Sequence, residues 1–318
     1  MLGIPYDTEA FPRGTVANGH AELSVKWDEI LWAAVTVGRP NRHYVFRHGA
    51  ASMYEALFRW SLVRMSLEQS GPRAARLRRT TAAKTLDPTE KGAVNYFLGM
   101  IFCKLFAAKL LNTPWLLHLD VFRPMLNPVL TGRSRPDLVG QVQGLTQWHA
   151  FECKGRVSPP DATDKMKAKA QAQRLVSVNG TSCSLHVGGV TYFKGERLNF
   201  YWRDPTPQNG NGINVPMSGD AWMHYYAPVL EAIESIDLNA LRGDHDNLVA
   251  IEGADVEVGI HPLVAKYLAG RQWERAQQAA VAAKGSIAKD GYQPDGIRVV
   301  AGESWTERFA EPGITEEG

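Results

Sequence analysis

The chain has 318 residues, of which 44% are hydrophobic, and its 35 Lys and Arg nearly balance its 33 Asp and Glu. This length and composition are typical of a globular protein that buries a substantial core in one or two domains. The three cysteines are widely spaced and odd in number, which argues against a disulfide framework and a zinc site, so we expect them to pack as small apolar groups.

Several classes of protein are disfavoured by missing motifs. The chain opens without a basic and apolar signal segment, and it has no run of about 18 uncharged apolar residues. We therefore expect a cytoplasmic protein without a membrane partner. A phosphate-binding loop and a Gly-x-Ser-x-Gly elbow are also absent, and the nine histidines have no metal-ligand spacing. ATP and nicotinamide chemistry are not expected.

Charge is unevenly distributed along the chain. Residues 1–210 contain 27 Lys and Arg against 16 Asp and Glu, whereas residues 211–318 contain 8 against 17. A positive excess of this size is typical of a surface that binds nucleic acid. A solvated linker between helices explains equally well the basic cluster just before residue 87, which contains Arg73, Arg76, Arg78, Arg79 and Lys84.

Residues 1–86 are predicted to form a mostly helical segment. Apolar residues predominate in 27–32, and a second helix is predicted through 50–60. Both stretches are interpreted as packing elements.

Residues 87–207 are predicted to form a mixed α/β core. Asp87, Pro88 and Glu90 have the N-cap, first-turn and capping-box positions of a helix over residues 88–112. This helix is apolar nearly all round, which predicts that it is buried. The elements expected after it are a strand at 115–122, a strand at 137–143, a strand at 148–154, a helix at 161–178 and a strand at 183–193.

The second and third of these strands are predicted to form a hairpin. A two-residue Gly144-Leu145 turn would place Asp137 directly opposite Glu152. Because side chains alternate along a strand, Lys154 would point to the same side as Glu152. Paired carboxylates hold hard divalent cations, and an ammonium group can orient a water molecule or neutralise developing charge. The alternative is a purely structural role, in which Asp137 is a surface residue and Glu152 and Lys154 form an ordinary ion pair.

Pro136, Asp137, Glu152 and Lys154 resemble the Pro-Asp…(Asp/Glu)-x-Lys signature of the restriction-endonuclease-like PD-(D/E)xK nuclease superfamily. The resemblance covers about a tenth of the chain. It implies a core of one helix, three strands, a helix and a strand, which is also the order predicted above, with helical additions at both ends. It further implies a nuclease that uses Mg²⁺ or Mn²⁺, with DNA as the preferred substrate over RNA, and a role in defence against foreign DNA or in genome maintenance.

The resemblance also implies further site residues. The backbone carbonyl of Cys153 would be a metal ligand, and an additional acidic ligand would be Glu55 or Glu90. Each glutamate has another explanation, because Glu55 can pair with Arg59 and Glu90 has the capping position. A functional glutamine on the following helix would be Gln171 or Gln173, between which no spacing selects.

Phosphate contacts are expected from the basic side of the helix predicted at 161–178. Lys165 and Lys169 lie one turn apart, and Arg156 precedes them; a solvated helix face is the alternative for the two lysines. Asp120, at the end of the first strand, is expected near the site.

Residues 208–318 are predicted to form an acidic, mostly helical region with helices near 218–236 and 262–284. This region could cover the core or mediate assembly, either as a homo-oligomer or with a partner protein. The competing class for the whole chain is a non-catalytic nucleic-acid-binding or assembly subunit that retains the nuclease fold. The complete set of Asp137, Glu152 and Lys154 argues against it.

Overall fold

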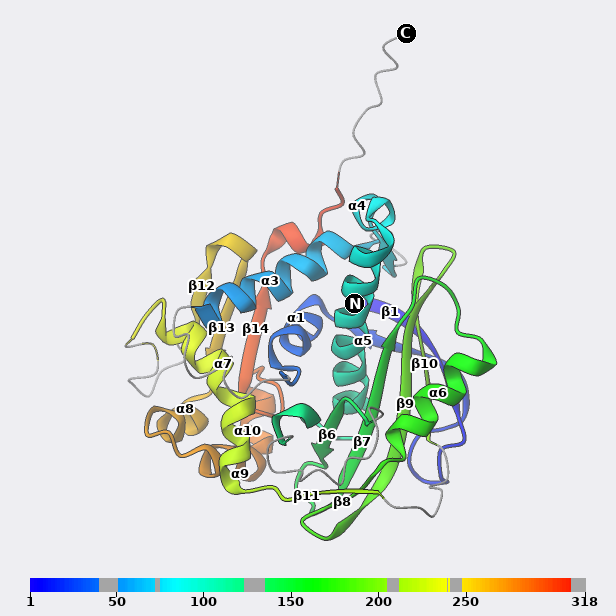
Figure 1. Cartoon of the computed structure of the whole chain (residues 1–318). Coiled ribbons are helices and arrows are strands. Elements are labelled where there is room, and N and C mark those ends of the chain that lie inside the picture. Colours follow the sequence, from blue (N-terminus) through cyan, green and yellow to red (C-terminus); the bar gives the residue numbers. More distant parts are fainter. Residues whose placement is uncertain are drawn as a thin grey trace.

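A computed structural model describes residues 1–39, 51–71, 75–122, 135–204, 212–238, 240 and 248–309. Within these residues the chain is mixed α/β, as predicted, and its strands form a large mixed sheet and a smaller antiparallel sheet (Figure 1). The path of the large sheet contains, in spatial order, β2 (Gly19–Val25), β1 (Leu2–Glu9), β10 (Arg197–Arg203), β9 (Thr181–Lys194), β7 (Trp148–Gly155), β6 (Leu138–Gln141) and β5 (Trp115–His118).

Four short strands join the large sheet beside this path, and three form the small sheet. The four are β3 (Leu67–Gln69), β4 (Leu77–Arg79), β8 (Leu175–Val178) and β11 (Ile213–Val215). The small sheet has the order β12 (Val249–Ile251), β13 (Val256–Ile260) and β14 (Ile297–Ala301).

Helices cover both faces of the large sheet and fill the space between the two sheets. The described α-helices are α1 (Trp27–Thr36), α3 (Ala51–Ser66), α4 (Thr81–Thr85), α5 (Pro88–Leu110), α6 (Ala162–Ala172), α7 (Met223–Glu234), α8 (Pro262–Ala269), α9 (Trp273–Ala282) and α10 (Lys284–Lys289). α5 packs on β7 and β9 from one side, and α6 packs on the same two strands from the other (Figure 1). α1 packs between α5 and β14 and links the two sheets.

The predicted order of helix, three strands, helix and strand is observed as α5, β5, β6, β7, α6 and β9, with β8 added before β9. α6 ends at Ala172 and not at residue 178, because residues 175–178 pair as a strand with β9 and β11. The first strand is also shorter than expected, since a 3₁₀ turn over Leu119–Phe122 follows it.

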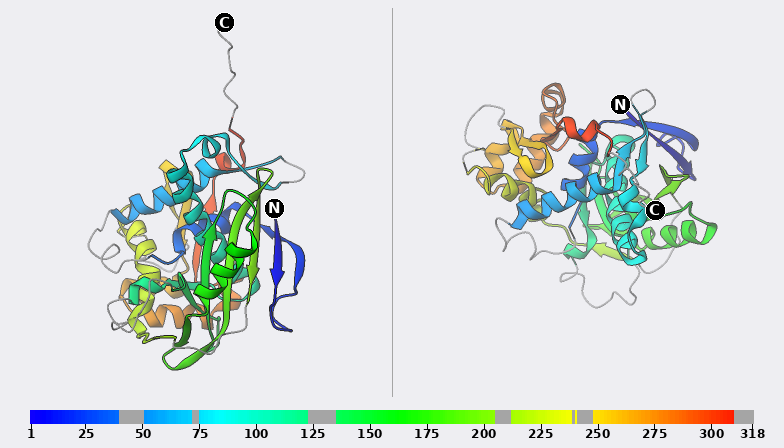
Figure 2. Two further views of the ribbon diagram at one scale, coloured as in Figure 1. Left: turned by 45° about the vertical axis from the view of Figure 1, so that its right-hand side comes forward. Right: turned by 90° about the horizontal axis from the view of Figure 1, so that it is seen from above.

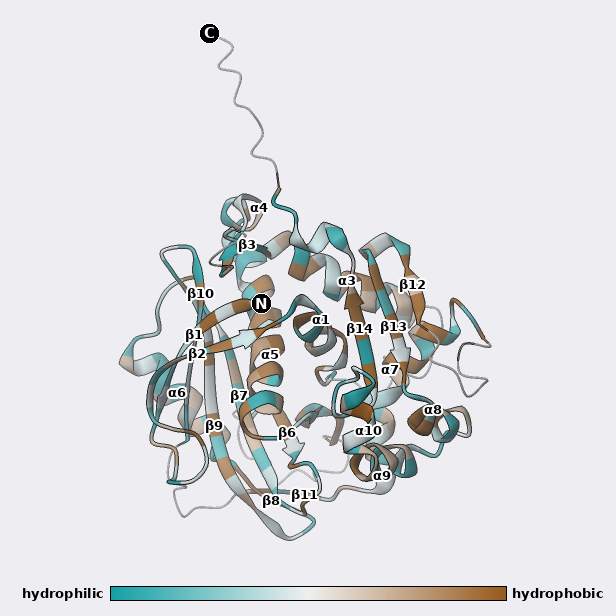
Figure 3. Cartoon of the chain, turned by 180° about the vertical axis from the view of Figure 1, so that it is seen from behind, coloured by the Kyte–Doolittle hydropathy of each residue, from teal (hydrophilic) through white to brown (hydrophobic). Residues whose placement is uncertain are grey.

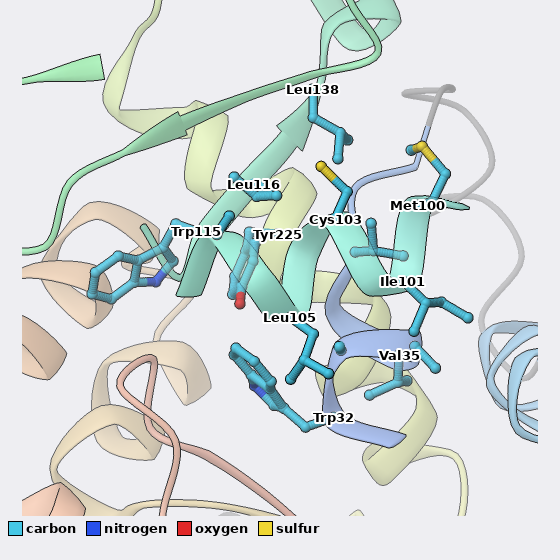
Figure 4. Packing of buried hydrophobic residues seen from close by; sticks show 14 of the residues in the cluster. Trp32, Val35, Met100, Ile101, Cys103, Leu105, Trp115, Leu116, Leu138 and Tyr225 are labelled. Carbon is cyan, nitrogen blue, oxygen red and sulfur yellow. The ribbon is translucent and has the colours of Figure 1, made fainter. Parts of the chain in front are cut away.

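The long helix α5 is the central element of the core. Asp87 caps it by accepting bonds from the Thr89 and Glu90 amides, as its sequence predicts. By length and composition α5 could span a membrane, but 67% of its apolar window is buried against the rest of the chain. Figure 3 shows its hydrophobic colour beside the large sheet, and Figure 4 shows the packing of Met100, Ile101 and neighbouring residues.

The N-terminal segment contains strands that the sequence interpretation did not include. β1 pairs in parallel with β10, where Tyr6 lies opposite Phe200, and β2 pairs with β1 at the edge of the sheet (Figure 2). Buried side chains from Leu2 to Trp305 belong to one large hydrophobic cluster. The boundaries expected near residues 86 and 207 therefore do not separate independent cores.

The C-terminal region also contains more than helices, because β12, β13 and β14 form a sheet that was not predicted. The predicted helix at 262–284 is divided into α8 and α9. The break falls at Gly270 and at Arg271, whose positive φ of 53° is incompatible with a continuing right-handed helix.

A buried polar network joins the two sheets. The Lys104 ammonium group on α5 donates to the Tyr225 hydroxyl at 2.7 Å, and this hydroxyl donates to Asp295 Oδ2 at 2.6 Å. Trp32 Nε1 donates to the same carboxylate at 2.8 Å, and its ring centroid lies 4.4 Å from the Lys104 nitrogen. Lys104 and Asp295 are both 0% exposed, so these hydrogen bonds replace the contacts with water that each group loses on burial.

Candidate metal and phosphate site

The hairpin register places the two predicted carboxylates together. Leu138 pairs with Phe151 and Gln141 pairs with Trp148, so Asp137, one residue before β6, lies across from Glu152. The connection is longer than predicted, because the Val142 amide donates to the Gln147 carbonyl and leaves residues 143–146 as the loop. The register is unchanged by this difference, since the hairpin remains centred between residues 144 and 145.

The side chains of Asp137 and Glu152 lie close together, Glu152 buried and Asp137 partly exposed. The backbone amide of Cys153 donates to Asp137 Oδ2 at 2.9 Å. Burial, followed by the charge of Asp137, raises the pKa of Glu152 to about 8 against the opposing effect of Lys154. Burial also raises the pKa of Asp137.

One oxygen of this pair has no donor among the described residues. Glu152 is 3% exposed, and its Oε2 is buried without a hydrogen-bond partner from this part of the chain. The charge of Asp137 raises the pKa of Glu152, so the two carboxyl groups are within electrostatic reach of each other. When both groups are ionised, the two neighbouring negative charges favour a cation, and a divalent ion fits the two carboxylates and the adjacent Cys153 carbonyl by donor type.

Lys154 is held beside this pair by the helix on the same side of the sheet. Its Nζ donates to Glu152 Oε1 at 2.8 Å and to Gln171 Oε1 at 2.7 Å. The structure therefore distinguishes the two glutamines: Gln171 lies in α6 and contacts Lys154, whereas Gln173 lies just after the helix end.

The two candidates for an additional acidic ligand, Glu55 and Glu90, make hydrogen bonds away from the carboxylate pair. Glu55 binds Arg39 and Arg59, each at 2.6 Å, and these charges bring its pKa down to about 2 despite its burial. Glu90 accepts from the Asp87 amide at 3.2 Å as part of the α5 cap. Within the described ranges, no group of three or more His, Cys, Asp or Glu side chains is arranged to hold a metal ion.

Two of the side chains expected to contact phosphate, Arg156 and Lys165, contact other residues of the chain. Arg156 pairs with Asp164, and the Lys165 nitrogen lies 4.1 Å from the centroid of the Tyr201 ring. Lys169 lies in α6, but its side chain is outside the described part of the structure.

The basic cluster before residue 87 is paired with acids. Arg76 contacts Glu22, Arg78 contacts Glu68, and Arg79 and Lys84 contact Glu196; Arg73 falls outside the described residues. These pairs favour a structural role for the cluster over a free nucleic-acid surface.

Of the polar residues near the carboxylate pair, the sequence interpretation named Asp120 as a neighbour of the site but not Arg135 or His118. Asp120 is close enough to act on the pKa of Asp137, as expected, but it is paired with Arg135. Burial, opposed by the charge of Asp120, lowers the pKa of His118 to about 4.

The three cysteines are free and buried, as predicted.

Comparisons of this chain with models of protein families, with curated proteins and with solved structures found no match.

Proposed function

We propose that the chain is a divalent-metal-dependent nuclease that hydrolyses phosphodiester bonds, with DNA as its preferred substrate. The observation that carries the proposal is the pair of Asp137, which is partly buried, and Glu152, which is buried and whose Oε2 has no donor among the described residues. The pair lies beside Lys154, which Gln171 holds in place. A structural ion pair between Glu152 and Lys154 alone would not account for a second, partly buried carboxylate in the same place.

Each residue of the pair and its neighbours has a role in this proposal. Asp137, Glu152 and the Cys153 carbonyl would hold Mg²⁺ or Mn²⁺. Such an ion polarises a phosphoryl oxygen and lowers the pKa of bound water. Lys154 would orient the attacking water or neutralise charge that develops on the phosphate, and Gln171 is a positioning residue that fixes the lysine.

The wider setting supports the same proposal. The elements from α5 to β9 follow the order that the resembled nucleases have, so we assign this region a restriction-endonuclease-like core. The positive excess of residues 1–210 favours a polyanionic substrate. A cytoplasmic role in defence or genome maintenance, and assembly through the C-terminal region, are parts of the proposal that depend on the resemblance and on composition.

The test is cleavage of plasmid, linear DNA and RNA with Mg²⁺ or Mn²⁺. Asp137→Ala and Glu152→Ala should each abolish cleavage, because each removes charge that compensates the cation. Glu257→Ala, which removes an exposed carboxylate of β13, is the matched control and should cleave normally. Full activity in either folded site variant would contradict the proposal, and a wild type that binds DNA without cutting it would favour the non-catalytic subunit.

The proposed role of Gln171 has its own test. Gln171→Ala should lower the single-turnover rate about tenfold or more while Mn²⁺ affinity stays unchanged, because a hydrogen bond to a charged group contributes about 1.5–3 kcal/mol. Gln173→Ala is the matched control from the same stretch of chain. Equal rates in the two variants, or a loss of Mn²⁺ affinity in Gln171→Ala, would show that Gln171 does not position Lys154 for the reaction.

A further inference from the structure

A second feature lies beside the carboxylates: a pocket of about 480 Å³ between the end of α1, α3 and α5. Its volume falls in the range of about 300–1,000 Å³ that small-ligand pockets have. We call it the aromatic pocket, and the lining residues that define it are Phe58, Tyr96, Phe97, Arg39, Arg59 and Glu55.

The aromatic side chains are arranged around one central ring. Phe58 from α3 and Tyr96 from α5 both meet Phe97 edge to face, with centroids 5.4 and 5.6 Å away. Phe58 is 51% exposed and Tyr96 is 41% exposed, although both line the pocket. Two rings that the fold leaves half uncovered at the mouth of a pocket offer flat apolar faces to a ligand.

Charge in the pocket is fixed and positive. Arg39 and Arg59 are 5% and 6% exposed, and they share the single carboxylate of Glu55. Among the described residues, Arg39 Nη2 is buried and makes no hydrogen bond of good geometry, although it lies 2.5 Å from Glu55 Oε2. The two buried guanidinium groups against one carboxylate leave a net positive charge among the charged residues that line the pocket.

The pocket adjoins the carboxylate pair. Burial raises the pKa of the Tyr96 hydroxyl, and the charge of Asp137 raises it further, so the two groups are within electrostatic reach. Gly38 also lines the pocket, and a Cβ atom on it would lie 2.4 Å from the backbone nitrogen of His118, the last residue of β5; the next amide, that of Leu119, donates to the backbone carbonyl of Asp137 at 2.8 Å. The aromatic pocket therefore lies on the Asp137 side of the carboxylate pair.

We infer that the aromatic pocket binds an unpaired nucleobase next to the phosphate that is cleaved, so that the substrate is single-stranded DNA or a frayed duplex end. This inference rests on the proposed nuclease function and adds its substrate class. Aromatic side chains stack on bases of any sequence, whereas bases inside a duplex are already stacked and cannot enter a pocket without being extruded.

The experiment measures binding separately from cleavage. A single-stranded oligonucleotide that contains 2-aminopurine is titrated with the full chain in Ca²⁺, and a blunt duplex of the same sequence is the comparison. Stacking should quench the fluorescence of 2-aminopurine in the single strand. The Phe58→Ala/Tyr96→Ala double variant should lose the quenching and bind the single strand about 5- to 150-fold more weakly.

Tyr54→Ala is the matched control, because Tyr54 is an exposed aromatic residue on α3 that does not line the pocket. It should bind and quench as the wild type does. Phe58→Leu and Tyr96→Leu keep apolar contacts without a stacking face, and they replace the alanine variants if those unfold.

The outcomes separate the two proposals. Equal affinity of the double variant and the wild type for the single strand, or equal affinity of the wild type for duplex and single strand, would overturn the inference while leaving the nuclease proposal intact. Quenching that depends on Phe58 and Tyr96, in a protein whose cleavage survives Asp137→Ala, would support the base pocket and remove the proposed catalytic site.

Discussion

The carboxyl group of Glu152 has a protonation state that depends on its surroundings more than on its own chemistry. Its pKa of about 8 in the folded chain lies well above the ordinary value of 4.5, chiefly because it is buried and then because Asp137 is near. Between these two values the folded protein binds more protons at this group than the unfolded chain does. The free energy of unfolding of the metal-free protein should therefore fall as pH rises through that interval.

Glu152→Gln removes this titration and should flatten the fall, which cannot exceed about 1.4 kcal/mol per pH unit for one group. The measurement is urea unfolding from pH 5 to pH 8 in the presence of a chelator. Asp137 remains in the variant and has a raised pKa of its own, so part of the slope should persist. Parallel curves for the wild type and Glu152→Gln would show that Glu152 is ionised in the folded protein throughout this range.

The residues around Glu152 show which parts of a site can be predicted from the sequence alone. The alternation of side chains and the centre of the hairpin were enough to place Asp137, Glu152 and Lys154 together, because these relations are local. Gln171 could be named only as one of two candidates, since the end of α6 decides which one faces Lys154. The pairing of Glu55 with Arg59 follows from helix spacing, but its second partner, Arg39, does not.

Among the elements, α5 was the most predictable and the N-terminal strands the least. The α5 cap and its apolar run are encoded within about 24 consecutive residues. In β1, alternate residues from Leu2 to Thr8 are buried, which is a period-two pattern, but its partner β10 lies nearly 200 residues away. Pairing over such a separation leaves no local signal. The small sheet was missed for another reason, because β12 and β13 are only three and five residues long and give a weak alternating pattern.

Two glycines in α5 give a sharp test of how this helix meets the sheet. A Cβ atom on Gly99 would lie 2.8 Å from the backbone carbonyl carbon of Lys154, whereas a Cβ atom on Gly92 meets nothing within 4 Å. Gly92→Ala should stabilise the protein by up to about 1 kcal/mol, because alanine favours a helix over glycine.

Gly99→Ala should instead destabilise it by about 1–3 kcal/mol, the usual effect of overpacking, and it should lower cleavage because Lys154 is displaced. Thermal or urea unfolding of the two variants checks the opposite signs, and the cleavage assay checks the link to the site. Stabilisation by both substitutions would mean that α5 does not approach β7 as closely as the structure shows.

For the whole molecule, the question is what couples the small sheet to the large one. α1 packs on both α5 and β14, and the network of Lys104, Tyr225 and Asp295 crosses the same interface. The sequence showed Lys104 as a charge within an apolar run, but its distant partner could not be identified without the fold. A buried charge in this position stabilises only the arrangement in which its partner is present.

Replacing Lys104 or Asp295 alone should therefore lower the free energy of unfolding more than replacing both residues together. Lys104→Met or Asp295→Asn alone leaves a charged or polar partner buried without compensation and should lower the free energy of unfolding by about 3–5 kcal/mol. The double variant should lose less than the sum of the two single losses, because the uncompensated group is removed with its partner. Urea unfolding of all four proteins, followed by the fluorescence of the nine tryptophans, completes the cycle. Additive losses would mean that Lys104 and Asp295 act independently, and the two sheets would then be coupled by the apolar contacts of α1 alone.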